Sequence, residues 1–237
     1  MELTLKNSIN GLNELFKDDS DIPEGSVILV TGVEGGLKSG FVFNMISNHL
    51  ADNEKHGLYA TLEETEESHL RNMASLGIKK PGSLHIFDYR DVRHEWENEE
   101  PDIFKITEDM INFYKEKYEN FNLFALDSLN ALYSLSNINL RKQMYRFFTM
   151  LRAKNLTSFL IMETCPLERH LPVGSSDYIE RPEYFLADGI IELGTVEDME
   201  NVKRYIQIRK MRSANHSMEK HQILVGKDGL YIVGSLY

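Results

Sequence analysis

The chain of 237 residues is poor in cysteine, proline and basic side chains, and each shortage excludes a class of protein. A single cysteine, Cys165, cannot form an internal disulfide, which excludes a disulfide-stapled scaffold and fits a reducing, cytoplasmic compartment. Six prolines and 15 glycines are too few for a collagen-like chain. With 26 Lys and Arg against 37 Asp and Glu, the net charge is −11, so a nucleic-acid partner is not the default expectation.

Long apolar runs are also missing, so we expect no membrane span. The N-terminal segment lacks an apolar stretch behind a basic start and does not look like a signal peptide. The least charged stretch, Asn120 to Leu140, has Asp127 as its only charged residue but carries too many Asn and Ser for a bilayer span. We interpret it as a buried strand and the segment that follows.

Short apolar runs alternate with longer helical stretches through most of the chain. The expected strands are Ser26–Thr31, Gly57–Leu62, Leu84–Phe87, Leu123–Leu126 and Ser158–Met162. The expected helices are Ser39–Asn53, Glu66–Leu76, Ile103–Tyr118 and Leu140–Lys154. Strands that alternate with helices of this length predict an α/β fold with a mainly parallel, doubly wound sheet flanked by helices.

The last 50 or so residues differ, because apolar segments there are joined by turns rather than helices. We expect them to add antiparallel strands at one end of the sheet: Gly189–Leu193, Val202–Lys210, Gln222–Val225 and Leu230–Val233. The clearest turn is Lys227-Asp228-Gly229. No internal repeat or Gly/Ser linker interrupts the chain, and we expect residues 1–237 to form a single domain.

A glycine-rich turn follows the first expected strand and leads into a helix. Its sequence, Gly32-Val33-Glu34-Gly35-Gly36-Leu37-Lys38-Ser39, has the strand–turn–helix context of a phosphate-binding P-loop. Backbone N–H groups around Gly32, Gly35 and Gly36, together with the helix N-terminus, would cradle phosphate. Lys38 would reach the β- and γ-phosphates of ATP, and the Ser39 hydroxyl would ligate Mg²⁺.

The turn departs from the P-loop pattern at Leu37, where Gly is usual. A left-handed backbone at this position would cost Leu roughly 1–2 kcal/mol, and its side chain must point away from the nucleotide. Two interpretations stay open: a degenerate Walker A loop that binds ATP weakly, or an ordinary glycine-rich turn between a strand and a helix.

Carboxylates end two further expected strands. Asp127 follows the apolar run Leu123–Leu126, where it would support Mg²⁺ beside Ser39 or cap the next turn. Glu63 and Glu64 follow the second strand, where one of them would orient the attacking water.

Purely structural interpretations of these carboxylates are equally open. The Glu pair is also typical of a helix start, with Thr61 or Thr65 as the N-cap. Glu163-Thr164, just after the last expected parallel strand, would sense phosphate or cap the next turn.

Taken in order, these pieces resemble the RecA-superfamily P-loop ATPases, and specifically the KaiC-like branch common in archaea. The resemblance covers nearly the whole chain. It is carried by the segments Ile9–Leu15, Ile22–Gly32, Tyr59–Thr65, Leu126–Leu129, Ala187–Leu193 and Arg204–Arg212 followed by His216-Ser217. The departures are Leu37, Glu34 where the family usually has Pro, and Ser213-Ala214 where it usually has Gly after the Arg.

The resemblance implies a RecA-like fold, ATP and Mg²⁺ as cofactors, and ring-shaped hexamers with nucleotide between protomers. It implies that Lys210 and Arg212 act on the γ-phosphate of a neighbouring copy, as arginine fingers do. The function expected is that of an ATP-binding regulatory protein with slow hydrolysis. The alternatives are a pseudo-ATPase scaffold that has lost tight nucleotide binding, and a recombinase-like DNA-binding protein.

Overall fold

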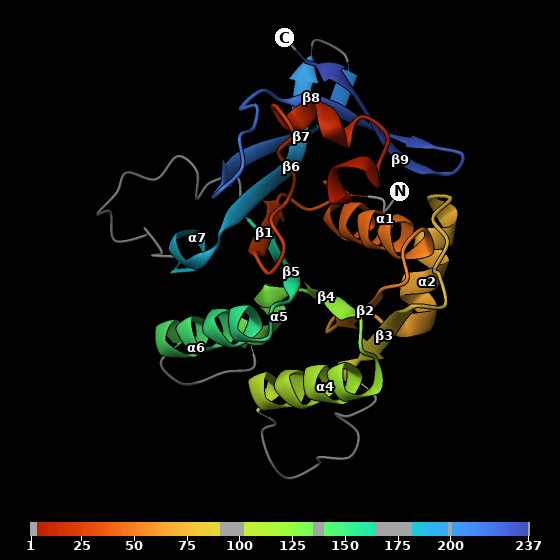
Figure 1. Cartoon of the computed structure of the whole chain (residues 1–237). Coiled ribbons are helices and arrows are strands. Elements are labelled where there is room, and N and C mark those ends of the chain that lie inside the picture. The colour runs from red at the N-terminus through yellow and green to blue at the C-terminus, as the bar shows by residue number, and fades with distance from the viewer. Residues whose placement is uncertain (1–3, 91–101, 135–139, 165–181, 199–200, 237) are drawn as a thin grey trace.

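A nine-stranded sheet forms the centre of the protein in a computed structural model that describes residues 4–90, 102–134, 140–164, 182–198 and 201–236 (Figure 1). The strand order is β3-β2-β4-β5-β1-β6-β7-β8-β9. The first six strands in this order pair in parallel, and the last three add antiparallel neighbours. This arrangement confirms the expected α/β fold with an antiparallel extension at its C-terminal end.

The first five strands along the chain lie where the apolar runs predicted them, with ends that differ by at most two residues. Their bounds are β1 Val27–Gly32, β2 His56–Thr61, β3 Leu84–Asp88, β4 Phe121–Asp127 and β5 Thr157–Glu163. β1 and β4 are buried along almost their whole length. Burial on both faces explains why these strands are continuously apolar rather than alternating.

Helices cover both faces of the parallel strands (Figure 1). α1 (Lys38–Ala51) and α2 (Glu66–Ser75) pack on one face, together with two short 3₁₀ helices, Leu5–Asn7 and Leu12–Leu15. α4 (Ile103–Lys117), α5 (Leu129–Ser134) and α6 (Leu140–Ala153) lie on the other. Two buried apolar clusters, one on each side of the sheet, hold these layers together.

The four C-terminal strands are longer than the sequence predicted, and the expectation of an antiparallel Gly189–Leu193 is wrong in part, because β6 pairs in parallel with β1 and is antiparallel only to β7. β6 spans Gly189–Asp198 and pairs along its whole length with β7, Asn201–Met211. β8 (His221–Gly226) and β9 (Gly229–Ser235) form a hairpin, and the predicted turn there is confirmed by the pairing of Gly226 with Gly229. Before β6 comes α7 (Pro182–Leu186), a five-residue helix that the sequence did not predict.

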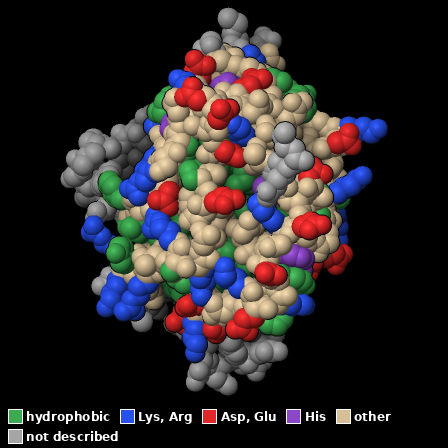
Figure 2. Space-filling view, viewed as in Figure 1, with side chains coloured by type: hydrophobic (Ala, Val, Ile, Leu, Met, Phe, Trp, Pro, Cys, Tyr) green, Lys and Arg blue, Asp and Glu red, His purple; other side chains and the backbone are tan. Residues whose placement is uncertain are grey.

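None of the helices in the described ranges combines the length and the apolar character that crossing a bilayer requires. On the face shown in Figure 2, acidic and basic side chains are interspersed rather than gathered by sign.

The strand order brings together the ends that matter for function. β1 lies between β5 and β6, and the carboxyl ends of β1, β2, β4 and β5 meet along one edge of the sheet. Open α/β sheets place their ligands at this edge. We call it the carboxyl edge.

Candidate nucleotide site

Two glycines of the turn after β1 are required by its geometry. Gly32 passes so close to β6 that a Cβ atom there would lie 1.8 Å from the Leu193 carbonyl oxygen. Gly35 has φ +73°, in the left-handed region that favours glycine. The Gly36 N–H donates to the Val33 carbonyl (3.3 Å) and closes the turn. The three predicted phosphate-loop glycines therefore form a tight turn at the carboxyl edge.

Leu37 adopts the left-handed conformation, with φ 67° and ψ 24°, immediately before α1. The backbone therefore takes the shape for which Gly is usual, at a cost of roughly 1 kcal/mol or more for a residue with a Cβ. The isobutyl group packs against the apolar cluster beneath α1 and so points into the protein. Its carbonyl accepts the first helical hydrogen bond, from Phe41 N–H (2.8 Å). Neighbouring Glu34 is exposed.

Lys38 is the first residue of α1, and its side chain is only 6% exposed. The ammonium donates to the Val33 carbonyl at 2.9 Å and to Glu163 Oε1 at 3.2 Å. Glu163 ends β5 directly beside Gly32, and its side chain is 47% exposed. The lysine that would contact phosphate is thus held by one loop carbonyl and one carboxylate.

Asn130 fixes the backbone of Glu163. Its side-chain amide donates to the Glu163 carbonyl (3.2 Å), and its Oδ1 accepts from the Glu163 N–H (2.7 Å). Asn130 lies in α5, three residues after Asp127, so this pair of hydrogen bonds joins the end of β4 to the end of β5.

Ser39, Asp127 and Tyr59 bring three oxygen-bearing side chains together. The Tyr59 hydroxyl donates to Asp127 Oδ2 (2.7 Å), and Ser39 also hydrogen-bonds to both residues. Burial raises the pKa of Asp127, although the hydrogen bonds from Tyr59 and Ser39 oppose the rise. A buried carboxylate beside a serine hydroxyl is a donor set that suits a hard cation such as Mg²⁺, whose charge would replace the lost hydration.

Glu63 and Glu64 follow β2 and face different partners. The Ser128 hydroxyl, next to Asp127, donates to Glu63 Oε1. The Asn72 side-chain amide lies within hydrogen-bond distance of both oxygens of Glu64, at 3.2 and 2.9 Å. The interpretation as a helix start is confirmed as well, since Thr65 caps α2 by accepting from the Ser68 N–H (3.0 Å).

Lys210 and Arg212 lie away from the carboxyl edge of their own chain. Lys210 pairs with Ile190 of β6, whose β1 partner Leu29 precedes Gly32 by three residues. At about 3.3 Å per residue, Lys210 is roughly 10 Å from the turn along the strand, and Arg212 is farther.

Both cations contact α7 and the residues after it. Lys210 donates to the carbonyls of Tyr184 (3.1 Å) and Ala187 (2.6 Å), and partial burial together with the nearby Arg212 lowers its pKa. Arg212 is 55% exposed and pairs with Asp188 at 3.3 Å. Arg152 pairs with the other oxygen of Asp188 at 3.0 Å. We call this group, Lys210, Arg212, Arg152 and Asp188, the α7 corner.

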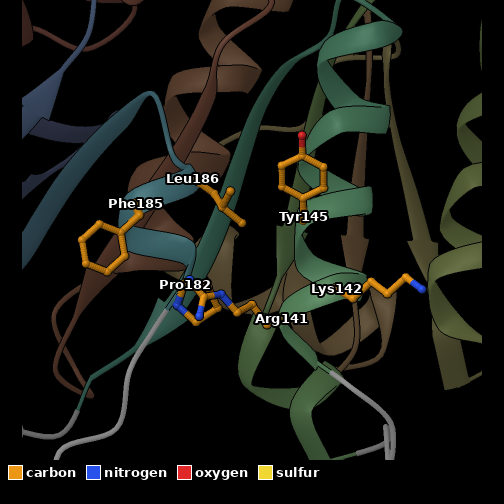
Figure 3. A pocket seen from close by; sticks show the side chains of 6 residues that line it. All are labelled: Arg141, Lys142, Tyr145, Pro182, Phe185 and Leu186. Carbon is orange, nitrogen blue, oxygen red and sulfur yellow. The ribbon is translucent and has the colours of Figure 1, made fainter.

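An apolar pocket of about 390 Å³ opens between α6 and α7, beside the α7 corner. Its lining residues are Arg141, Lys142, Tyr145, Pro182, Phe185 and Leu186. Figure 3 shows Tyr145 and Leu186 facing each other across the gap, with Lys142 pointing away from it. Phe185 and Tyr145 are 67% and 62% exposed.

The strand–turn–helix of β1 and α1 within this strand order defines a P-loop protein of the RecA type. Comparisons with known proteins agree. A family profile described as "ATPase: KaiC" matches residues 5–237. The chain therefore belongs to the KaiC family of ATPases.

Relatives of two lengths are similar to it. The circadian clock oscillator protein KaiC of Parathermosynechococcus lividus is 24% identical over 92% of this chain, which spans 41% of that protein. A UPF0273 protein of Aeropyrum pernix is 26% identical, and the match covers 96% of this chain and 92% of the relative. The crystal structure of a KaiC-like protein from Pyrococcus horikoshii OT3 matches with a TM-score of 0.76 and 25% identity, over 96% of this chain and 97% of that one.

Three partners at this site were not predicted from the sequence. Tyr59 contacts Asp127, Asn130 holds the Glu163 backbone, and Arg204 of β7 donates to the Gly35 carbonyl at 3.3 Å. The sequence indicated a phosphate sensor or a turn cap at Glu163-Thr164, and did not predict Glu163 as the partner of Lys38. Its position at the end of a strand beside the P-loop strand was the available signal.

Proposed function

We propose that this chain is a regulatory ATPase that binds Mg²⁺ and ATP at the carboxyl edge and hydrolyses ATP slowly. Membership of the KaiC family supports a nucleotide-binding regulatory protein. The observation that carries the finer proposal is the meeting of Lys38 and Ser39, at the start of α1, with Asp127, at the end of β4. We further propose that residues 1–237 act as one such domain, in the cytoplasm.

In this proposal the glycine turn and the α1 N-terminus hold the phosphates, and Lys38 contacts the β- and γ-phosphates. Mg²⁺ would supply charge neutralisation between the phosphates, held by Ser39 with Asp127 in support. Glu63 orients the attacking water, because its carboxylate accepts a hydrogen bond from Ser128, the residue that follows Asp127. Both oxygens of Glu64 face Asn72, which suits a positioning role.

Assembly with further copies supplies the second half of the site. Lys210 and Arg212 lie too far from their own P-loop to reach its γ-phosphate, which supports action on a neighbour's nucleotide. Exposed Phe185 and Tyr145 lie beside these cations and would be covered by the neighbour. By resemblance, the assembly is a hexamer.

The test is isothermal titration of the chain with Mg-ATP, beside Lys38→Ala as the matched control. We expect the original chain to bind and the variant to bind at least about 100-fold more weakly, because the buried ammonium is lost. The absence of heat up to millimolar ATP would reject the proposal.

The second candidate is a pseudo-ATPase scaffold, favoured by the left-handed Leu37 and by the pairing of Lys38 with Glu163. Leu37→Gly separates the two candidates. If the parent binds no ATP and Leu37→Gly does, the chain is a pseudo-ATPase. If both bind with similar affinity, the left-handed loop already serves the nucleotide. A DNA-binding role has less support, given the net charge of −11.

A further inference from the structure

The Glu163 carboxylate pairs with the Lys38 ammonium, which is the group that a bound phosphate would contact. We infer that its carboxylate is a built-in competitor for the Lys38 ammonium, so that only a ligand carrying several phosphate charges displaces it. The inference rests on the proposed nucleotide site and adds a regulation of that site: Glu163 sets its affinity and its preference for polyphosphates.

The contact geometry gives the first argument. Lys38 Nζ donates to Glu163 Oε1 at 3.2 Å and to the Val33 carbonyl at 2.9 Å. An ammonium has three donors, so these two contacts leave one. A β- or γ-phosphate that bound Lys38 would therefore lie against the Glu163 carboxylate, and two anions at that distance repel each other.

Burial gives the second argument. The Lys38 side chain is 6% exposed, and a buried ammonium without a counter-charge is costly. Glu163 supplies that charge while no phosphate is bound, and a phosphate supplies it afterwards. Exchange of one anion for another keeps Lys38 paired in both states.

Glu163 also has the freedom that such an exchange requires. Its side chain is 47% exposed, so the carboxylate can rotate into water. Its backbone is fixed, since Asn130 bonds to both its N–H and its carbonyl, and the next residue, Thr164, donates its N–H to Gly32. Displacement therefore needs a side-chain rotation and no rearrangement of β5.

Ligand selectivity follows from this exchange. A ligand must displace the Glu163 carboxylate from Lys38, so its attraction to Lys38 is offset by the loss of that ion pair. A triphosphate brings several charges and gains net attraction, whereas a monophosphate gains little. The chemical class preferred is a nucleoside triphosphate or an inorganic polyphosphate.

The experiment measures the affinity of four proteins, each checked for folding by its thermal melt, for Mg-ATP, inorganic tripolyphosphate and AMP. They are the original chain, Glu163→Gln, Glu163→Asp and Glu34→Gln. Glu34 is an exposed carboxylate of the same turn, so Glu34→Gln removes an equal charge without touching Lys38. A fifth protein, Lys38→Ala, reports whether binding uses the site at all.

We expect Glu163→Gln to bind Mg-ATP and tripolyphosphate about tenfold more tightly, because the competing charge is gone. Glu163→Asp keeps the charge and Glu34→Gln keeps the competitor, so both should stay within about threefold of the original chain. AMP affinity should change less than that of the other two ligands.

Three results would overturn the inference. If Glu163→Gln binds no more tightly while Lys38→Ala abolishes binding, the competitor is absent but the proposed function stands. If Glu34→Gln tightens binding equally, the effect is general charge and not competition. If neither the original chain nor Glu163→Gln binds any of the ligands at millimolar concentration, the proposed function fails together with the inference.

Discussion

The two ends of the parallel strands carry similar charged side chains in opposite settings. At the carboxyl edge, Lys38 is 6% exposed and contacts groups of its own site. At the α7 corner, Arg212 is 55% exposed and shares Asp188 with Arg152. Both cations are paired, but the buried Lys38 can contact only a ligand that enters its own site, whereas the exposed Arg212 can also contact a neighbouring molecule. In the proposed function, the first group acts within the chain and the second acts between chains.

The largest effect is expected from the α7 corner. Arg212→Ala should leave Mg-ATP affinity nearly unchanged and lower the rate of hydrolysis roughly 10³-fold, as loss of an arginine finger does. Parallel titration and phosphate-release assays measure the two quantities.

A mixture of two variants tests directly whether Arg212 acts on the nucleotide of a neighbouring copy. Lys38→Ala and Arg212→Ala are each inactive on this account, but a mixed assembly contains interfaces where an intact Lys38 faces an intact Arg212. Recovery of hydrolysis on mixing would show action between copies. Full activity of Arg212→Ala alone would contradict it.

At the carboxyl edge, substitutions of the two glutamates should differ in their effect on hydrolysis. Glu63→Gln should reduce hydrolysis roughly 10²- to 10³-fold with little change in ATP affinity, since orienting the water affects the chemical step. Glu64→Gln, its matched neighbour, should cost less, because Glu64 contacts Asn72 rather than Ser128. A larger loss for Glu64→Gln would reverse the assignment.

A smaller effect is expected in acid, from His69 of α2. Its ring packs against Phe43 and Tyr59, with centroids 5.0 and 4.6 Å apart, and burial lowers its pKa to about 4. In the unfolded chain the His69 ring takes up a proton near pH 6.5, whereas in the folded protein it stays neutral down to about pH 4. The free energy of unfolding is therefore unaffected by His69 above pH 6.5 and falls as the pH drops from 6.5 towards 4.

This fall in the free energy of unfolding amounts to about 3 kcal/mol, and it should be absent from the His69→Phe variant, which has no titrating ring. Urea unfolding at pH 7 and pH 4 measures the difference between the two proteins. Equal pH dependence would mean that the ring is not held neutral beneath Tyr59.

The sequence predicted most of the fold because the signals involved are local. Apolar runs and helical spacing located β1 to β5 and the four long helices to within two residues at nearly every end. The turn sequence Lys227-Asp228-Gly229 likewise predicted the last hairpin. The five residues of α7 are too few to show a helical period, so this helix was missed.

Contacts at the candidate site were harder to foresee, because strand order rather than spacing creates them. Lys38 and Glu163 are 125 residues apart and meet only because β5 lies beside β1. Tyr59 reaches Asp127 through the pairing of β2 with β4. The strain expected at Leu37 was predictable, since it depends on one backbone conformation, and its φ of 67° confirms it. The roles assigned to Glu63, Lys210 and Arg212 stay predictions.

The most direct measurement is a crystal structure with Mg²⁺ and a non-hydrolysable ATP analogue. The account predicts the triphosphate wrapped by residues 32–39, with Lys38 on the β- and γ-phosphates, Ser39 on the metal, and the Glu163 side chain turned out into solvent. An analogue bound elsewhere, with Lys38 still held by Val33 and Glu163, would contradict it.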